Sequence, residues 1–105
     1  MFRPCVYILT NRAGGVLYIG VTRDLERRLA EHRDGRGSRF AAKYNLHRLV
    51  WFRQFAMMAD AIKEEKRLKA WKRQWKLDLI EATNPNWQNR TPPNAPATKT
   101  SPSSS

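Results

Sequence analysis

Residues 5–20 read CVYILTNRAGGVLYIG, and this stretch decides how the chain begins to fold. Two apolar runs rich in β-branched and aromatic residues, each with one tyrosine, flank a loop that ends in Gly14-Gly15. Such runs favour strands, and a glycine-containing connection between them favours an antiparallel hairpin. The sequence therefore predicts two paired strands, over Cys5–Thr10 and Val16–Ile19.

The residues after the hairpin predict three further elements. We expect a helix from about Asp24 to Arg33 with Thr22 as its N-cap, and a third strand over Leu49–Phe55. Residues 59–82 have helical periodicity and predict one long helix, which ends before Asn84-Pro85. The order β-β-α-β-α predicts an α+β fold, with a small three-stranded antiparallel sheet flanked by helices.

Composition divides the chain at Trp87. Residues 1–87 predict one domain, because a chain of 105 residues leaves no room for a second core. Residues 88–105 are rich in Pro, Ser, Thr and Asn and offer little to bury, so they predict a disordered tail.

The charge of the chain indicates a polyanionic partner. Twenty Lys and Arg face nine Asp and Glu, for a net charge of +11. Only Arg90 and Lys99 of the basic residues follow Trp87, so residues 1–87 keep +9, from 18 basic and nine acidic side chains. Neutralising phosphates releases their counterions, which favours nucleic acid as the partner, ahead of an anionic membrane surface.

Cysteine content and hydropathy set the expected compartment. Cys5 is alone, so it forms no disulfide within the chain. The longest apolar run, near Cys5 to Leu9, is too short to span a membrane, and no export signal opens the sequence. We expect a cytoplasmic protein with no membrane partner.

Tyr7 and Tyr18 are the first candidates for chemistry. If Thr10 pairs with Gly15, a four-residue connection joins the strands and Tyr7 lies directly opposite Tyr18. Two phenols in one site could assist the deprotonation of each other or of a water. They could equally be ordinary sheet aromatics with hydroxyls at the rim.

A second group of candidates lies on the first predicted helix. Four residues at spacings i, i+3, i+4 and i+7 share one face: Leu25, Arg28, Leu29 and His32. Burying a guanidinium without an anionic partner is costly, so an inward Arg28 indicates a nearby phosphate or carboxylate. Alternatively, Arg28 extends over the sheet into water and His32 is merely hydrogen-bonded.

The long helix adds carboxylates and cations. Its apolar stripe comprises Ala61, Leu68, Trp71, Trp75 and Leu79. Glu64 and Glu65 flank that stripe on either side, as a Mg²⁺ ligand or as a salt-bridge partner, for instance to Arg28. Seven cations within fourteen residues are a solvated face or, with Trp71 and Trp75 among them, a track for the phosphate backbone: Lys63, Lys66, Arg67, Lys69, Lys72, Arg73 and Lys76.

Together these motifs resemble the GIY-YIG endonuclease domain, in particular its small stand-alone, UvrC-like bacterial members. The first signature block appears as Cys5-Val6-Tyr7, with cysteine in place of glycine, and the second as Tyr18-Ile19-Gly20. Arg28 follows Tyr18 by ten residues and His32 follows Arg28 by four, as in the family.

The later part of the chain continues the resemblance, up to about residue 87. Residues 61–71 resemble the carboxylate helix of the family, with Glu65 at the metal-binding position. Residues 84–87, Asn-Pro-Asn-Trp, resemble the motif that closes the stand-alone domains. The late site asparagine of several branches has no certain counterpart, and Asn84 is the nearest candidate.

The resemblance implies hydrolysis of a phosphodiester, of the kind used in DNA repair, at a single Mg²⁺ or Mn²⁺ ion. Glu65 would hold the metal, and Arg28 would stabilise charge on the phosphoryl oxygens. Tyr7 would act as general base, with Tyr18 and His32 orienting it or lowering its pKa, although the sequence does not decide between the two tyrosines. We expect DNA as the nucleic acid and a protein partner that supplies target choice. The alternative is a non-catalytic nucleic-acid-binding module on the same scaffold.

Overall fold

The computed structural model describes residues 3–90, and its centre is a three-stranded antiparallel sheet. The strands are β1 (Cys5–Thr10), β2 (Leu17–Thr22) and β3 (Arg48–Gln54), in the order β2-β1-β3. β1 is buried at every position, as the central strand of a sheet covered on both faces. The predicted α+β fold with a three-stranded antiparallel sheet is confirmed.

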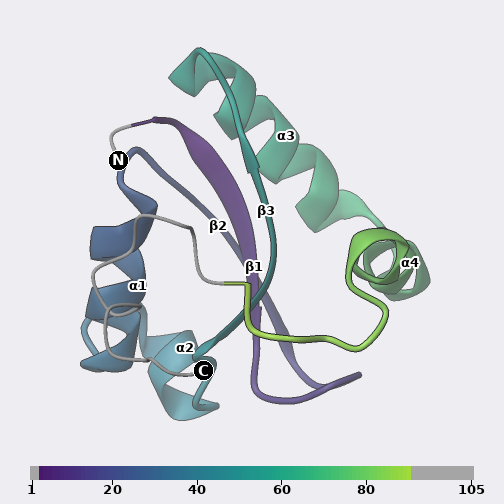
Figure 1. The fold of residues 1–105 in the computed structure, drawn as a ribbon. Coiled ribbons are helices and arrows are strands. Elements are labelled where there is room, and N and C mark those ends of the chain that lie inside the picture. The colour runs from purple at the N-terminus through teal and green to yellow at the C-terminus, as the bar shows by residue number, and fades with distance from the viewer. Residues whose placement is uncertain (1–2, 91–105) are drawn as a thin grey trace, which may run out of the picture.

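Helices cover both faces of this sheet (Figure 1). One layer contains α1 (Leu25–Arg33) and α2 (Arg39–Lys43), and the other contains α3 (Met58–Ala70) and α4 (Arg73–Thr83). Alternate residues of β1 point to opposite layers, so Tyr7 packs with the α1 layer while Val6 and Ile8 pack with the α3–α4 layer. Within residues 3–90, none of the helices combines the length and hydropathy that a membrane crossing requires.

The hairpin has a different register from the predicted one. Thr10 pairs with Leu17 and not with Gly15, so Tyr7 lies opposite Gly20 and Tyr18 opposite Leu9. The loop comprises residues 11–16, two more than predicted. It is stabilised by a hydrogen bond of 3.1 Å that the Val16 amide donates to the Asn11 side chain. A shift of two residues keeps each side chain on its face, so both tyrosines still point toward α1.

The first helix begins with a different cap from the predicted Thr22. Asp24 is the N-cap, and its side chain accepts a hydrogen bond from the Arg27 amide. Thr22 instead accepts a hydrogen bond from the Asp24 amide, one step outside the helix. The acidic cap lies where the helix dipole favours a negative charge.

The predicted long helix is wrong as a single element, because it breaks at Trp71 and Lys72. Both residues have extended backbone, with ψ of 150° and 156°. One helix over residues 59–82 would be about 36 Å long, against about 23 Å for the seven-residue β3, so it would overhang the sheet. The break lets α4 return to β3 and bury Ile80 beside Leu68, while Trp75 of the predicted stripe stays 50% exposed.

The folded chain continues past the predicted boundary at Trp87. The Leu49 amide donates to the Asn89 side chain at 3.1 Å, and the Arg90 amide donates to the Leu49 carbonyl at 2.6 Å. Residues 88–90 therefore lie against β3 and do not belong to a disordered tail. Residues 91–105, the rest of the predicted tail, lie outside the described residues.

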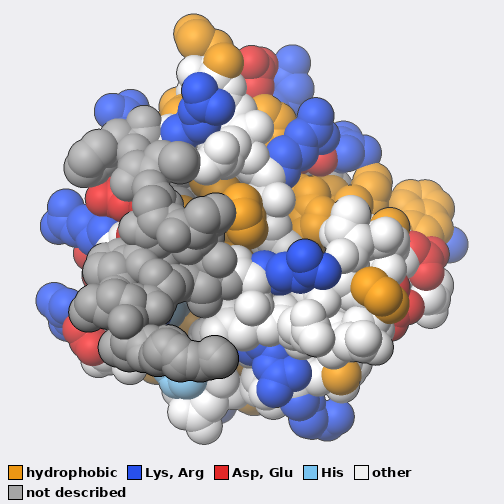
Figure 2. Space-filling view, in the orientation of Figure 1, with side chains coloured by type: hydrophobic (Ala, Val, Ile, Leu, Met, Phe, Trp, Pro, Cys, Tyr) orange, Lys and Arg blue, Asp and Glu red, His pale blue; other side chains and the backbone are white. Residues whose placement is uncertain are grey.

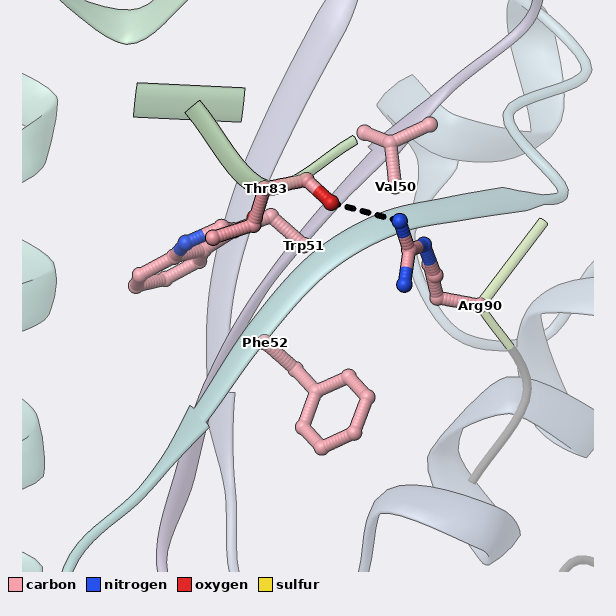
Figure 3. Close-up of a pocket in the computed structure, with 5 residues that line it drawn as sticks. All are labelled: Val50, Trp51, Phe52, Thr83 and Arg90. Carbon is pink, nitrogen blue, oxygen red and sulfur yellow. Dashed lines mark hydrogen bonds between the residues drawn. The ribbon is translucent and has the colours of Figure 1, made fainter. Parts of the chain in front are cut away.

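Arg90 also closes a cavity of about 230 Å³ at this edge of the sheet (Figure 3). Its guanidinium donates to the Thr83 carbonyl, while Val50, Trp51 and Phe52 of β3 form the rest of the lining. None of the predicted catalytic residues lines this cavity, which lies where the C-terminal segment packs against β3.

Candidate active site

The buried pair Tyr7 and His32 forms the centre of the candidate site. Tyr7 comes from β1 and is fully buried, and His32 comes from the last turn of α1 and is 2% exposed. The Tyr7 hydroxyl and His32 Nε2 lie 3.0 Å apart in a hydrogen bond. The helix spacing that places His32 beside Leu25 and Leu29 thus brings an imidazole to the phenol of the central strand.

Tyr18 completes an aromatic cluster around this pair. Its ring centroid lies 6.2 Å from that of Tyr7 and 5.4 Å from that of His32. Tyr18 is only partly buried, and Phe40 of α2 stacks on it with a 27° interplanar angle and a centroid distance of 6.4 Å. Of the two tyrosines, Tyr18 is the one with access to a bound molecule.

Arg28 brings the positive charge that the helix face predicted. Its side chain is 35% exposed, and NH1 donates to Glu31 at 3.0 Å, so the carboxylate partner is Glu31 and neither Glu64 nor Glu65. Nε of Arg28 is buried without a hydrogen-bond partner among the described residues. Both Arg28 and Glu31 line a cavity of about 300 Å³, together with Thr22, Arg23, Asp24 and Arg27. Three arginines and two acidic residues line this cavity, and Arg28 is the lining residue that it shares with the cluster.

The electrostatics favour neutral aromatic groups around a permanent cation. Burial raises the pKa of Tyr7, the neighbouring Tyr18 raises it further, and Arg28 offsets part of the rise. Burial and the Arg28 charge lower the pKa of His32, so the imidazole is neutral at pH 7. The hydrogen bond that Arg28 donates to Glu31 raises the pKa of Arg28, and nearby Tyr7 contributes to the rise. The cluster therefore contains a proton-accepting imidazole and a phenol that holds its proton.

Two glycines make room for the cluster, and sequence reasoning missed their role. A Cβ on Gly20 would lie 2.5 Å from the Tyr7 hydroxyl oxygen, and a Cβ on Gly37 would lie 2.6 Å from Nδ1 of His32. Any side chain at these positions would displace the ring beneath it. The glycine of the Tyr18-Ile19-Gly20 motif was the available signal, whereas nothing in the sequence pointed to Gly37, Glu31 or Phe40.

Glu65 is the one predicted catalytic residue that does not take part in the contacts described above. It lies on α3, which packs against β2 and β1 on the layer opposite α1. Its side chain is 12% exposed and forms an ion pair with Lys69 at 2.6 Å. In residues 3–90, no hydrogen bond or ion pair connects Glu65 with Tyr7, Tyr18, Arg28 or His32. The convergence of Glu65 with these side chains stays a prediction.

The described residues do not form a closed metal cage, since no three His, Cys, Asp or Glu side chains gather among residues 3–90. Mg²⁺ keeps several waters and is often held by one or two carboxylates plus a substrate phosphate. The single, largely buried carboxylate of Glu65 fits that kind of ion and not a tightly resident one. Glu64 has similar exposure, 13%, and is likewise paired with a cation, Arg67, at 2.6 Å.

The seven predicted phosphate-binding cations do not form one continuous face, because the helix breaks among them. Arg73 donates to the carbonyls of Gly14 and Gly15 at 2.7 Å and so anchors α4 to the hairpin loop. Arg67 and Lys69 are paired with Glu64 and Glu65. The exposed lysines are Lys63 and Lys66 on α3, Lys69, and Lys72 at the break, while Lys76 is partly buried.

Asn84, the candidate late asparagine, has a structural position. It is 1% exposed, and its side-chain amide donates to the carbonyls of Val50 at 3.1 Å and Gln88 at 2.8 Å. Its side-chain oxygen accepts from the Gln88 amide at 2.9 Å. These bonds occupy the side chain in joining α4, β3 and the C-terminal segment.

Comparison with known proteins gives consistent matches to one kind of domain. A family model described as the GIY-YIG catalytic domain matches residues 3–78. A UPF0213 protein of Staphylococcus saprophyticus is 33% identical over 80 residues, which cover 76% of this chain and 96% of the relative. A UPF0213 protein of Oceanobacillus iheyensis is 37% identical over 76 residues, covering 72% and 87%. The solution NMR structure of a UPF0213 protein from Bacillus halodurans aligns with a TM-score of 0.53 and 28% identity, over 94% of this chain and 97% of the other.

Proposed function

The chain belongs to the GIY-YIG family of nuclease domains, which act on nucleic acid, and on that premise we propose that it is a divalent-metal-dependent endonuclease. The substrate we propose is DNA, and the UvrC resemblance favours a role in repair. The observation that carries the proposal is the cluster of Tyr7, Tyr18, Arg28 and His32, with its hydrogen bond and with the arginine-rich cavity that Arg28 lines beside it. Buried titratable groups with shifted pKa values beside a cleft are typical of functional sites.

Arg28 acts on the phosphate in this proposal. Its NH1 is held by Glu31, but a guanidinium has five N–H donors and the side chain is 35% exposed, so donors remain for a non-bridging oxygen. The ion pair with Glu31 fixes the guanidinium before the substrate arrives. A preorganised cation is worth most where negative charge develops during phosphoryl transfer.

In this proposal the two tyrosines and His32 accept and relay the proton of the attacking water. The raised pKa of Tyr7 and its full burial make it a poor direct base for water, contrary to the role that the resemblance implies. Tyr18 is accessible, so we assign it the position beside the attacking water. Tyr7 then connects Tyr18 to the neutral imidazole of His32, whose Nε2 can take up a proton through the 3.0 Å hydrogen bond.

Glu65 would hold a hydrated Mg²⁺ or Mn²⁺ ion together with the substrate phosphate. α3 packs against one face of the edge strand β2, and Tyr18 and Gly20 lie on the other face of the same strand. This arrangement supports our proposal that Glu65 reaches the cluster around the β2 edge of the sheet. The ion would neutralise phosphate charge and stabilise the leaving oxygen. A protein partner that selects the target belongs to the same proposal.

Glu65→Gln and Glu64→Gln provide a matched test of the metal assignment. The two carboxylates are adjacent, 12% and 13% exposed, and each pairs with a cation one turn along α3. With labelled single-stranded, duplex and branched DNA and with RNA, we expect cleavage in Mg²⁺ or Mn²⁺ and none in EDTA. Glu65→Gln should abolish cleavage but keep affinity, while Glu64→Gln keeps both. The reverse ranking would refute the assignment.

The rival is a nucleic-acid-binding module without catalysis. The separation of Glu65 from the cluster contacts and the high pKa of Tyr7 favour it. It predicts salt-dependent binding with no cleavage of any substrate in either metal. That result would leave the scaffold as a binder and remove the nuclease proposal.

A further inference from the structure

The break between α3 and α4 exposes an aromatic surface that the proposed nuclease chemistry does not use. A cavity of about 350 Å³ is lined there by Trp71, Trp75, Asp78 and Leu79. We propose that this elbow is a binding site for an unpaired nucleobase, which stacks on Trp75 beside Trp71. The inference rests on nucleic acid being the substrate, and it adds that the preferred substrate contains a single-stranded segment.

The geometry of the two indoles suits a stacked base. Their rings are perpendicular, at 90°, with centroids 5.9 Å apart, so they form two walls of one corner. Trp75 is 50% exposed and forms no part of the buried core, which contains Leu68 and Ile80 instead. Hydrophobic side chains reach the surface over α4, next to charged ones (Figure 2). A large aromatic exposed beside a cavity is costly in water and indicates a binding surface.

A basic side chain lies next to each of the two indoles, and one of the two, Arg67, is also paired with Glu64. The Arg67 guanidinium lies 4.7 Å from the Trp71 ring centroid, and Lys72 Nζ lies 5.2 Å from that of Trp75. Lys76, the residue after Trp75, donates from Nζ to the Lys69 carbonyl at 3.4 Å. Aromatic platforms flanked by basic side chains are how proteins hold single strands without sequence preference.

Nucleic acid fits this surface better than a protein partner does. Lysines are depleted in the cores of protein interfaces, whereas here Lys72 lies directly over the Trp75 ring. The net charge of +11 favours the same ligand. Asp78, the one acidic residue of the lining, accepts a hydrogen bond from Gln74 at 2.9 Å and repels phosphate, so it favours entry of the base and not of the backbone.

The test measures affinity by fluorescence anisotropy in EDTA, with a labelled single strand and a blunt duplex. Trp75→Ala in the full chain should weaken single-strand binding about 10-fold and change duplex binding less than about twofold, since only the single strand offers a free base. Trp75→Phe should restore most of the affinity. Met57→Ala, which removes another exposed apolar side chain at 61% exposure, should have no effect.

Three results would overturn the inference: equal losses on both substrates, no loss on the single strand, or a dimer in sedimentation that Trp75→Ala dissociates. The last would assign the surface to a second copy of the chain. Because binding is measured without metal, the outcome is separate from catalysis. A protein that never cleaves yet shows the selective loss retains this site, and an active nuclease without that loss lacks it.

Discussion

The two faces of the sheet differ in what they bury. The α1 face buries polar groups, with Tyr7 hydrogen-bonded to His32 and Arg28 paired with Glu31 at its rim. The α3–α4 face buries an apolar core and the neutral amide of Asn84, whose side chain is hydrogen-bonded through both its nitrogen and its oxygen, and it leaves Trp75 half exposed. On the α1 face, Arg28 Nε and His32 Nδ1 are buried without a hydrogen-bond partner among the described residues. Such atoms are costly to bury, so stability alone gives little reason for this arrangement. The difference assigns chemistry to one face, and support and substrate binding to the other.

Gly20→Ala should have the largest effect on the α1 face. The new Cβ would lie 2.5 Å from the Tyr7 hydroxyl oxygen, in a position where neither can move without disturbing His32. We expect a loss of about 1–3 kcal/mol in the free energy of unfolding and of most cleavage activity. Thermal unfolding and a cleavage assay measure both.

Gly14→Ala is the control for this change. It adds the same methyl where no atom lies within 4 Å, at a φ of +69°. The backbone cost of about 1–2 kcal/mol would lower stability, but cleavage by the folded protein should persist. Equal losses of activity in the two variants would remove the argument that Gly20 protects the site.

His32 should determine the acid limb of the pH–rate profile. Its pKa is lowered by burial and by Arg28, and the proposal requires the neutral imidazole. The rate should therefore rise as pH increases through a value below 6.5 and level off near neutrality. His32→Gln should lower the rate about 10-fold and abolish this limb.

Stability gives an independent check on the same residue. The unfolded chain takes up the His32 proton near pH 6.5, before the folded chain does, so the free energy of unfolding should fall as pH drops below that value. His32→Gln should flatten this dependence. An unchanged slope in the variant would place the responsible group elsewhere.

Two truncations compare the predicted boundary with the observed one. Ending the chain after Trp87 removes the bonds of Gln88 to Asn84 and those of Asn89 and Arg90 to Leu49. At about 0.5–1.5 kcal/mol for each bond, the melting temperature should fall by several degrees. Ending it after Arg90 should leave the melting temperature unchanged. Equal melting temperatures for both would show that residues 88–90 add no stability.

The smallest effect concerns the salt dependence of binding. Lys66 and Lys72 are both exposed. The double substitution Lys66→Met and Lys72→Met should reduce the log–log slope of affinity against salt by about two units. Arg73→Met should change the slope less but lower stability, because its guanidinium holds the Gly14 and Gly15 carbonyls. A larger slope change for Arg73 would place the phosphates at the hairpin loop.

The sequence predicted the fold and the placing of Tyr7, Arg28 and His32 on the α1 face because both rest on local periodicity. The spacing of Arg28 and His32 fixed their common helix face, and alternation along β1 fixed the direction of Tyr7. A register error of two residues did not matter, since it preserves faces. The partners of these side chains were not predictable in the same way.

Features that depend on packing across the molecule could not be predicted from local pattern. The break at Trp71 has no proline or glycine to mark it, and it follows from fitting two helices to a short sheet. Glu31 was one of several carboxylates with which Arg28 could have paired. Residues 88–90 are polar and read as a tail, yet they bond to β3.

The most direct test of a nuclease site on the α1 face compares Arg28→Ala with Arg27→Ala. Both arginines lie on α1 and pair with Glu31, at 3.0 and 3.3 Å, but the Arg27 side chain is 77% exposed while Nε of Arg28 is buried. Measured on one labelled DNA, Arg28→Ala should lower the cleavage rate about 100-fold and affinity less than about twofold, whereas Arg27→Ala, which removes another lining residue of the same cavity, should lower affinity slightly and leave the rate nearly unchanged. Equal losses in both variants, or unchanged cleavage by Arg28→Ala, would contradict the account.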